Sequence, residues 1–184
     1  MFFTDVEVPA ENLIGAENEG WRYAKALLIH ERLSICDPTE VKARAAMLKR
    51  FCASQEGRSH LDASLPDVQR KLAALDIGLA ALDASYQRVR MDIEAGRDPG
   101  QGAAALKFMD TELSQTLHEI DIEMAGLTVC ADQTAAFRPS NDFEPVGPAA
   151  SSLAFAGYAF SRANSIAGGT SEVQKNIIWR GLSS

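Results

Sequence analysis

The sequence contains no run of basic residues. Its 25 Asp and Glu outnumber its 18 Lys and Arg, which gives a formal net charge of −7 at pH 7. Nucleic-acid binding needs a basic stripe that neutralises phosphates, so this class of partner is not expected. No apolar run is long enough to span a membrane, and no signal peptide is recognisable, so we expect a soluble, cytoplasmic protein.

Cysteine and histidine are also scarce. The sequence holds three of each, without the CxxC or paired His spacing that metal sites need, so no metal centre is predicted. An odd number of cysteines in this context predicts reduced thiols, mostly buried as small apolar side chains. These residues are Cys36, Cys52, Cys130, His30, His60 and His118.

Helical periodicity is abundant. Apolar residues between Leu65 and Ile93 recur in alternating steps of three and four, which predicts one long helix packed lengthwise on others. A helix is also expected from about Glu19 to Ser54, kinked or broken at Pro38, because proline lacks an N–H and crowds the preceding turn. Its apolar line should face the core and passes through Trp21, Ala24, Leu28 and Ile35.

The remaining segments complete an all-α pattern. Residues 56–66 are expected to form a loop, a third helix carries apolar residues from Leu106 to Leu127, and a fourth runs from about Ala149 to Asn164. The sequence therefore predicts an all-α, antiparallel (up-down) four-helix bundle with a short additional C-terminal helix over residues 17–184. Residues 1–16 are expected to be an extended segment that precedes it.

Glu31 breaks the apolar line of the first helix. It falls between Leu28 and Ile35, where a charged side chain is costly unless it is paired or neutral. Two interpretations remain open on these grounds. Glu31 pairs with a basic group of another helix or subunit, or it is a general base in a dry cleft, whose raised pKa suits proton abstraction near neutral pH.

The stretch SIAGGTSEVQKNII, residues 165–178, places two glycines directly before a helix start. Gly168 and Gly169 permit close approach of the backbone to a ligand, and the following helix N-terminus offers N–H groups to it. Ser171 and Gln174 have the spacing of a capping box. The alternative interpretation is a plain turn between helices.

Two blocks resemble the ends of the C-terminal helical domain of acyl-CoA dehydrogenases: PAENLIGAENEGWRYAKALLIHERLSI and SRANSIAGGTSEVQKNII. The resemblance implies an oxidoreductase with FAD that converts an acyl-CoA to a trans-2-enoyl-CoA in lipid β-oxidation. It also implies electron transfer to an electron-transferring flavoprotein and assembly into a dimer or tetramer. Residues 1–16 would then be the exit from a missing β-domain.

The resemblance also implies roles for particular residues. Most of the family carries its catalytic glutamate where Gly168 stands here, and a minority carries it in a Glu-Arg-Leu motif that Glu31, Arg32 and Leu33 match. Glu31 is therefore the predicted α-proton base, with Arg32 and the 167–169 loop at the substrate. The residues implied for substrate contact are Arg32, Ala167, Gly168 and Gly169, and those implied for FAD contact are Thr170, Glu172 and Arg58.

Departures from the family pattern keep other functions open. The Arg-x-x-Phe-Gly segment that touches a neighbouring subunit's FAD is reduced to Arg58, and the glutamine before a Gly-Gly turn is absent from DIEMAGLTV. These losses resemble a divergent bacterial group that includes heteromeric enzymes. The alternatives are thus a non-catalytic partner subunit or a helical oligomerisation domain, and these 184 residues alone are expected to be inactive.

Overall fold

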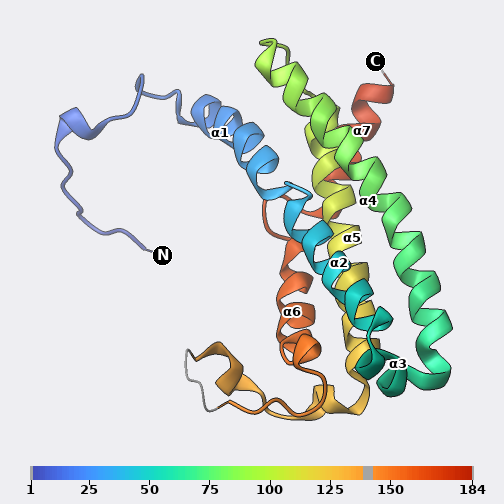
Figure 1. The fold of residues 1–184 in the computed structure, drawn as a ribbon. Coiled ribbons are helices and arrows are strands. Elements are labelled where there is room, and N and C mark those ends of the chain that lie inside the picture. Colours follow the sequence, from blue (N-terminus) through green and yellow to red (C-terminus); the bar gives the residue numbers. More distant parts are fainter. Residues whose placement is uncertain (1, 139–142, 184) are drawn as a thin grey trace.

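The computed structural model describes residues 2–138 and 143–183, with the side chains of Ile29, His30 and Arg32 also outside the described part. None of the residues in these ranges forms a β-strand, and none of their helices is long and apolar enough to cross a membrane. The prediction of an all-α fold is confirmed. The helices form one elongated body, from which the N-terminal segment extends as a separate arm (Figure 1).

Helices α2, α4, α5 and α6 run alternately down and up the body, and α5 lies at its centre (Figure 1). Helix α5 contacts α1, α2, α4, α6 and α7, so it connects all the other long elements. The expected short C-terminal helix is present as α7 and packs against α5. The bounds are α1 Gly20–Ile35, α2 Thr39–Ala53, α3 Gln55–Leu61, α4 Leu65–Glu94, α5 Gln101–Ala125, α6 Ala154–Ser161 and α7 Ser171–Leu182.

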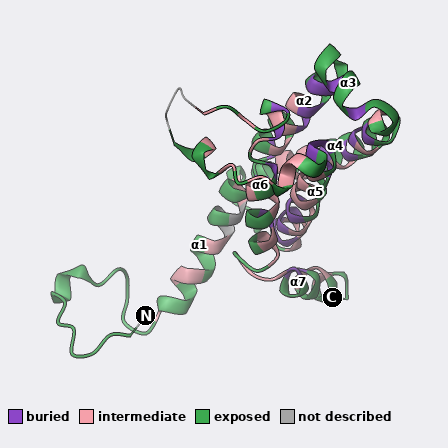
Figure 2. Ribbon diagram, turned by 90° about the horizontal axis from the view of Figure 1, so that it is seen from below, coloured by how far each residue is buried: buried purple, intermediate pink, exposed green. Residues whose placement is uncertain are grey.

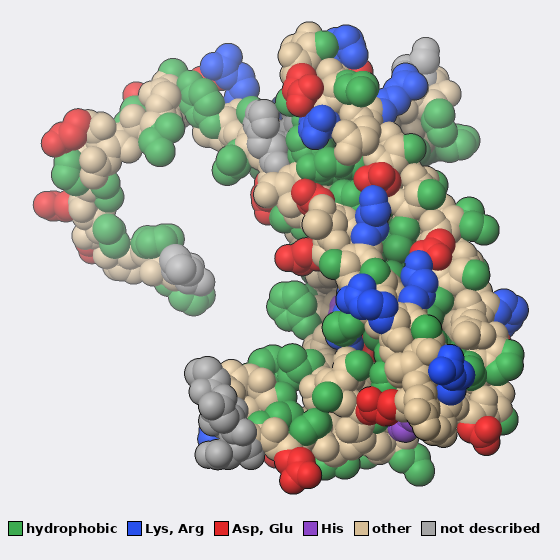
Figure 3. Space-filling view, in the orientation of Figure 1, with side chains coloured by type: hydrophobic (Ala, Val, Ile, Leu, Met, Phe, Trp, Pro, Cys, Tyr) green, Lys and Arg blue, Asp and Glu red, His purple; other side chains and the backbone are tan. Residues whose placement is uncertain are grey.

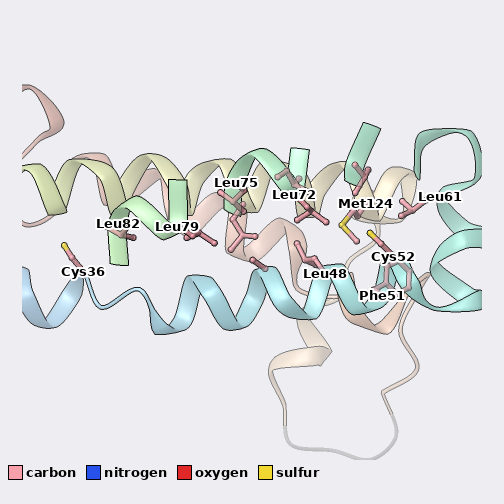
Figure 4. Packing of buried hydrophobic residues seen from close by; sticks show 14 of the residues in the cluster. Cys36, Leu48, Phe51, Cys52, Leu61, Leu72, Leu75, Leu79, Leu82 and Met124 are labelled. Carbon is pink, nitrogen blue, oxygen red and sulfur yellow. The ribbon is translucent and has the colours of Figure 1, made fainter. Parts of the chain in front are cut away.

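The apolar seam of α4 forms one wall of the core, as its periodicity predicted (Figure 4). Its buried members alternate by three and four residues, so they lie on one face of the helix and meet α2 and α5. Leu48 of α2 and Leu117 of α5 are fully buried against this wall. The buried side chains of α4 are Val68, Leu72, Leu75, Leu79, Leu82 and Val89.

Helix α1 corrects one expectation. Trp21 is 72% exposed and Ile35 is 53% exposed, so the predicted core-facing line of this helix is not buried within the chain. Figure 2 shows α1 and the segment before it as mostly exposed, in contrast to α2, α4 and α5. The reason is that α1 leaves the body and contacts α4 and α5 only in part.

The break at Pro38 is confirmed, but the predicted loop 56–66 is wrong. The chain forms α3 there, capped by Ser54, whose hydroxyl accepts a hydrogen bond from the Gly57 amide at 3.0 Å. Gly57 lies so close to α2 that a Cβ atom would stand 1.9 Å from the carbonyl oxygen of Phe51. This glycine therefore allows two helices to pack closely, whereas the composition of residues 56–66 had indicated a loop.

Two other helices are shorter than expected. Helix α5 ends at Ala125 because Gly126 has φ +57°, and the next apolar residue, Leu127, is 92% exposed. The segment 149–164 is α-helical only over α6, with 3-10 turns on both sides. Cys36 and Cys52 are buried as predicted, Cys130 is exposed, and none of the three forms a disulfide among the described residues.

A polar contact crosses the core between α2 and α5. Asp121 is 1% exposed, and its carboxylate accepts hydrogen bonds from the guanidinium of Arg44 and from Ser151 Oγ at 3.1 Å. Arg44 also donates to the carbonyl oxygen of Ala150 at 3.0 Å. A buried carboxylate is tolerated when its charge is paired and its lone pairs are satisfied, so this contact fixes how α2, α5 and the turn before α6 meet.

Candidate functional site

A cavity of about 270 Å³ lies where α1, α2 and α5 approach the glycine loop. Glu31 of α1 and Gly168 of the loop both line it, although 137 positions separate them in the sequence (168 − 31). Figure 3 shows acidic side chains on the flank of the helical body that faces the N-terminal arm. The other lining residues are Ile35, Asp37, Glu40, Val41, Lys107, Asp110, Ser114, Phe160, Asn164 and Ala167.

The break between α1 and α2 brings Glu31 and Glu40 to the same cavity. Pro38 is buried in the break, and the Asp37 carboxylate accepts hydrogen bonds from the Thr39 amide at 2.9 Å and from its hydroxyl at 2.5 Å. These bonds satisfy donors at the start of α2 and lower the pKa of Asp37. The local sequence thus ends one helix and starts the next at the cavity rim.

Glu31 itself is exposed in this chain. The sequence argument placed it on a core-facing line and expected desolvation to raise its pKa. The core-facing placement is wrong within the described residues, because Glu31 lies on an exposed part of α1. Glu31 nevertheless lines the same cavity as Gly168.

The glycine loop is held from below by two buried side chains. Gly168 and Gly169 have φ +67° and +97°, which side chains with a Cβ rarely adopt. Gln174 is completely buried, and its Nε2 donates to the carbonyl oxygens of Gly168 at 3.3 Å and Gly169 at 3.1 Å. The ammonium of Lys107 donates to the carbonyl oxygen of Asn164, so it anchors the preceding turn.

The N-cap of α7 is Thr170, one residue earlier than the sequence predicted. Its hydroxyl accepts a hydrogen bond from the Val173 amide at 3.3 Å, and the predicted capping-box partner Gln174 supports the loop instead. The reason is that the positive φ angles of the loop end at Gly169. Thr170 then has the extended geometry that an N-cap residue adopts directly before the helix.

We expect Thr170→Ala to lower the free energy of unfolding by about 1 kcal/mol, or the thermal midpoint by about 2–4 °C, because one amide of α7 loses its acceptor. Ser171→Ala is the matched control and should change the stability by less than about 0.5 kcal/mol. Thermal unfolding followed by circular dichroism measures both. If Ser171→Ala were the more damaging substitution, the cap would be assigned to the wrong residue.

Asp110 is a cavity residue that the sequence analysis missed. It is 8% exposed, and burial raises its pKa to about 6, while the positive charge of Lys107 lowers it and Glu40 raises it further. A signal was present: Asp110 lies four residues after Leu106 and three before Leu113, inside the apolar line of α5. A search for charged residues inside apolar helical lines, which singled out Glu31, would also have found Asp110.

The raised pKa of Asp110 makes the chain less stable as the pH rises. Unfolding returns the pKa of this carboxyl from about 6 to its ordinary value of 3.8, so the folded state binds the proton more tightly than the unfolded state. The stabilisation is complete below pH 4 and is lost as the pH passes 6.

We expect Asp110→Asn to raise the free energy of unfolding at pH 7.5 by about 2 kcal/mol and to leave it nearly unchanged at pH 4. Urea denaturation at the two pH values measures this difference, and an equal effect at both would contradict it.

The structure brings some of the predicted site residues together and separates others. Ala167, Gly168 and Glu31 share the cavity, while Gly169, Thr170 and the exposed Glu172 follow directly at the start of α7. The side chain of Arg32 lies outside the described residues. Arg58 lies on α3, at the opposite end of the bundle from α7, and donates to the carbonyl oxygen of Ala53 at 2.6 Å (Figures 1 and 2).

Cation binding is not supported by the described residues. No group of three or more His, Cys, Asp or Glu side chains in residues 2–138 and 143–183 could hold a metal ion.

Comparison with known proteins identifies this helical arrangement. The family model for the acyl-CoA dehydrogenase C-terminal domain matches residues 18–183. The chain belongs to this family. Among curated relatives, acyl-CoA dehydrogenase IpdE1 of Mycobacterium tuberculosis is 26% identical over 97% of the chain and 41% of its own length. The mitochondrial long-chain specific acyl-CoA dehydrogenase of Rattus norvegicus is 27% identical over 98% of the chain and 38% of its own length.

Solved structures show the same fold. The crystal structure of an acyl-CoA dehydrogenase from Geobacillus kaustophilus superposes with a TM-score of 0.74 and 24% sequence identity. It covers the whole chain, and the chain covers 44% of it. The chain thus spans about two fifths of the length of the relatives it matches.

Proposed function

We propose that this chain is the C-terminal domain of a flavin-dependent acyl-CoA dehydrogenase in which Glu31 removes the α-proton of an acyl-CoA thioester. The observation that carries the proposal is the cavity shared by Glu31 and Gly168. The loop has glycine where most of the family carries its base, and the carboxylate of the Glu-Arg-Leu motif stands at the same cavity.

The proposed reaction moves one proton and one hydride. The Glu31 carboxylate accepts the proton of the α-carbon, the β-carbon loses a hydride, and a trans-2-enoyl-CoA forms. FAD, when bound, supplies the hydride acceptor. Exclusion of water makes a carboxylate a stronger base, so we infer that bound acyl-CoA and neighbouring protein cover the exposed side of Glu31.

The start of α7 fits a polar part of the flavin nucleotide. Thr170, the N-cap of α7, would contact this part, and Gly168 and Gly169 let the backbone approach it because they carry no Cβ. The carboxylate of Glu172 in the first turn repels a phosphate, so the groups that suit this end are hydroxyls of a ribose or the edge of adenine. Arg58 lies too far along the bundle to join them in one chain, and would serve a neighbouring subunit.

Exposed apolar side chains support association with further protein. Trp21 and Leu27 of α1 and Trp179 of α7 are 72%, 67% and 69% exposed, which is unfavourable for isolated helices. We propose that these surfaces are covered by the preceding domains or by other subunits of a dimer or tetramer. We also propose that the protein is cytoplasmic and that its electron acceptor is an electron-transferring flavoprotein. Residues 1–184 alone are expected to be inactive.

A non-catalytic partner subunit remains the second candidate, since Glu31 is exposed within the chain and Arg58 is far from α7. One experiment separates the two. The intact protein that contains this chain is purified alone and with a co-expressed neighbour, and each sample is mixed anaerobically with acyl-CoA. Yellow protein that is bleached by acyl-CoA when purified alone supports a complete catalytic subunit. Colourless protein that acquires flavin only with its neighbour supports the partner role.

A further inference from the structure

Gln174 lies beneath the glycine loop with one half of its side-chain amide unsatisfied. The side chain is completely buried, and its Nε2 donates to the carbonyl oxygens of Gly168 at 3.3 Å and Gly169 at 3.1 Å. Its Oε1 is buried as well and has no hydrogen-bond donor among the described residues. Because carbonyl oxygens only accept hydrogen bonds, turning the amide round would lose both bonds.

The unsatisfied oxygen indicates what this glutamine contributes. A buried acceptor without a donor costs free energy, which an apolar side chain of similar size avoids. That cost offsets part of the stability that the two hydrogen bonds provide. What Gln174 offers beyond an apolar residue is direction, because its amide is aimed at two consecutive carbonyl groups. The orientation of these carbonyl groups is therefore the property that Gln174 controls.

The direction of the carbonyl groups fixes the direction of two backbone amides. In a trans peptide the C=O and the N–H point to opposite sides, and the described backbone contains no cis peptide bond. The carbonyl groups of Gly168 and Gly169 face Gln174, so the N–H groups of Gly169 and Thr170 face away from it. Neither N–H has an acceptor in the part of the chain that the structure describes. The loop therefore presents two adjacent free donors on its outer side.

Such a pair of donors needs support, because the loop is built from glycine. Glycine has more backbone freedom than any other residue, and Gly168 and Gly169 stand at φ +67° and +97°. Ordering the backbone only when a ligand arrives weakens the affinity, since the lost conformational entropy is subtracted from the binding free energy. The two hydrogen bonds from Gln174 order the loop beforehand.

We propose that Gln174 is a positioning residue for the flavin nucleotide. It turns the amides of Gly169 and Thr170 outwards, where they donate hydrogen bonds to acceptor atoms of the ribose or the adenine. This inference rests on the proposed function, which places this part of the flavin at the start of α7. Gln174 is itself fully buried, so its effect on the ligand passes through the peptide groups of the loop.

The test measures flavin affinity with and without the two side-chain hydrogen bonds. The intact protein that contains this chain is prepared without flavin and titrated with FAD, and the change in flavin fluorescence gives the Kd. Gln174→Met has a similar shape but no donor, and we expect it to weaken FAD binding by about 10- to 100-fold, the effect of one to two hydrogen bonds.

A second glutamine provides the matched control. Gln115 Nε2 also donates to a backbone carbonyl oxygen, that of Ser161 at 3.0 Å, at the end of α6. Gln115→Met should leave the Kd for FAD unchanged. Both variants should lower the thermal midpoint by a few degrees at most, so a difference in affinity reports on the loop. If Gln174→Met does not fold, Gln174→Asn replaces it and should weaken FAD binding as much, because its amide is one methylene too short to reach both carbonyls.

A double substitution tests whether the effect passes through the loop. Gly169→Ala should weaken FAD binding by itself, because a side chain with a Cβ is strained at φ +97°. Gly169→Ala and Gln174→Met disturb the same peptide group, so together they should weaken binding by clearly less than the product of their separate effects. Gly169→Ala combined with Gln115→Met should give the full product.

The outcomes separate this inference from the proposed function. An unchanged Kd in Gln174→Met, or effects of Gly169→Ala and Gln174→Met that multiply, overturns the role of Gln174 while the proposed function stands. A normal Kd with slower flavin reduction by acyl-CoA overturns it too, because the amides then serve the thioester. FAD that binds but is reduced by no acyl-CoA overturns the proposed function and leaves the comparison of Kd values valid. Absence of FAD binding by the unsubstituted protein overturns both.

Discussion

Glu31→Gln is expected to leave the flavin bound and to lower the rate constant of flavin reduction by acyl-CoA at least about 1,000-fold. The amide has nearly the same shape as the carboxylate but cannot accept a proton, and a positioned general base contributes roughly 100- to 10,000-fold to a rate. Gly168 and Ala167, which share the cavity with Glu31, provide no second base in the loop. Stopped-flow absorption of the flavin under anaerobic conditions measures the effect.

Proton abstraction can be measured separately from hydride transfer. An acyl-CoA with sulfur in place of the β-carbon cannot release a hydride, so exchange of its α-protons with deuterated water reports on the base alone. This exchange should be fast in the unsubstituted protein and absent in Glu31→Gln. The matched control is Glu56→Gln on α3, which is exposed at the far end of α2 and should change neither measurement. Normal exchange in Glu31→Gln would assign the base to another residue.

Arg44→Met is expected to lower the free energy of unfolding by about 3 kcal/mol, which corresponds to a fall of about 6–12 °C in the thermal midpoint. The substitution removes the guanidinium that pairs with Asp121. This carboxylate is 1% exposed, and it then keeps only the hydrogen bond from Ser151 Oγ among the described residues. Methionine fills most of the same volume, so the loss measures the unpaired charge more than a cavity.

The control for this effect lies on the same helix. Lys49 pairs with Asp76 at 2.5 Å, but both side chains are more than 40% exposed, so Lys49→Met should cost less than about 1 kcal/mol. Adding Asp121→Leu to Arg44→Met should recover much of the loss, since the buried charge is then absent. Equal effects of Arg44→Met and Lys49→Met would show that the buried pair does not stabilise the fold.

The helices that could be predicted are those whose periodicity is matched by burial on a single face. The seam from Leu65 to Ile93 predicted α4 because every member of it meets another helix. Pro38 predicted the break between α1 and α2 because its effect on the backbone is local and independent of the rest of the fold. The glycine pair predicted the loop before α7 for the same reason, since the ability to adopt positive φ angles is a local property of glycine.

Predictions that depended on neighbours were less successful. The apolar line of α1 has the right period, but its ends at Trp21 and Ile35 are exposed, since periodicity indicates a face of the helix and not the surface that covers it. The segment that forms α3 contains Gly57, whose role is packing against Phe51 and becomes apparent only when α2 and α3 meet. Gln174 has capping-box spacing but supports the glycine loop, because Thr170 occupies the cap.

The candidate site divides in the same way. The sequence alone determined the helical class, the break at Pro38, the glycine loop and a carboxylate in a Glu-Arg-Leu motif, since these follow from local backbone preferences and residue order. The tertiary structure decided that Glu31 and Gly168 share a cavity, that Asp110 forms its buried end, and that Arg44 pairs with Asp121. These are contacts between residues remote in sequence, and their energies depend on burial and distance, which arise only when the helices pack.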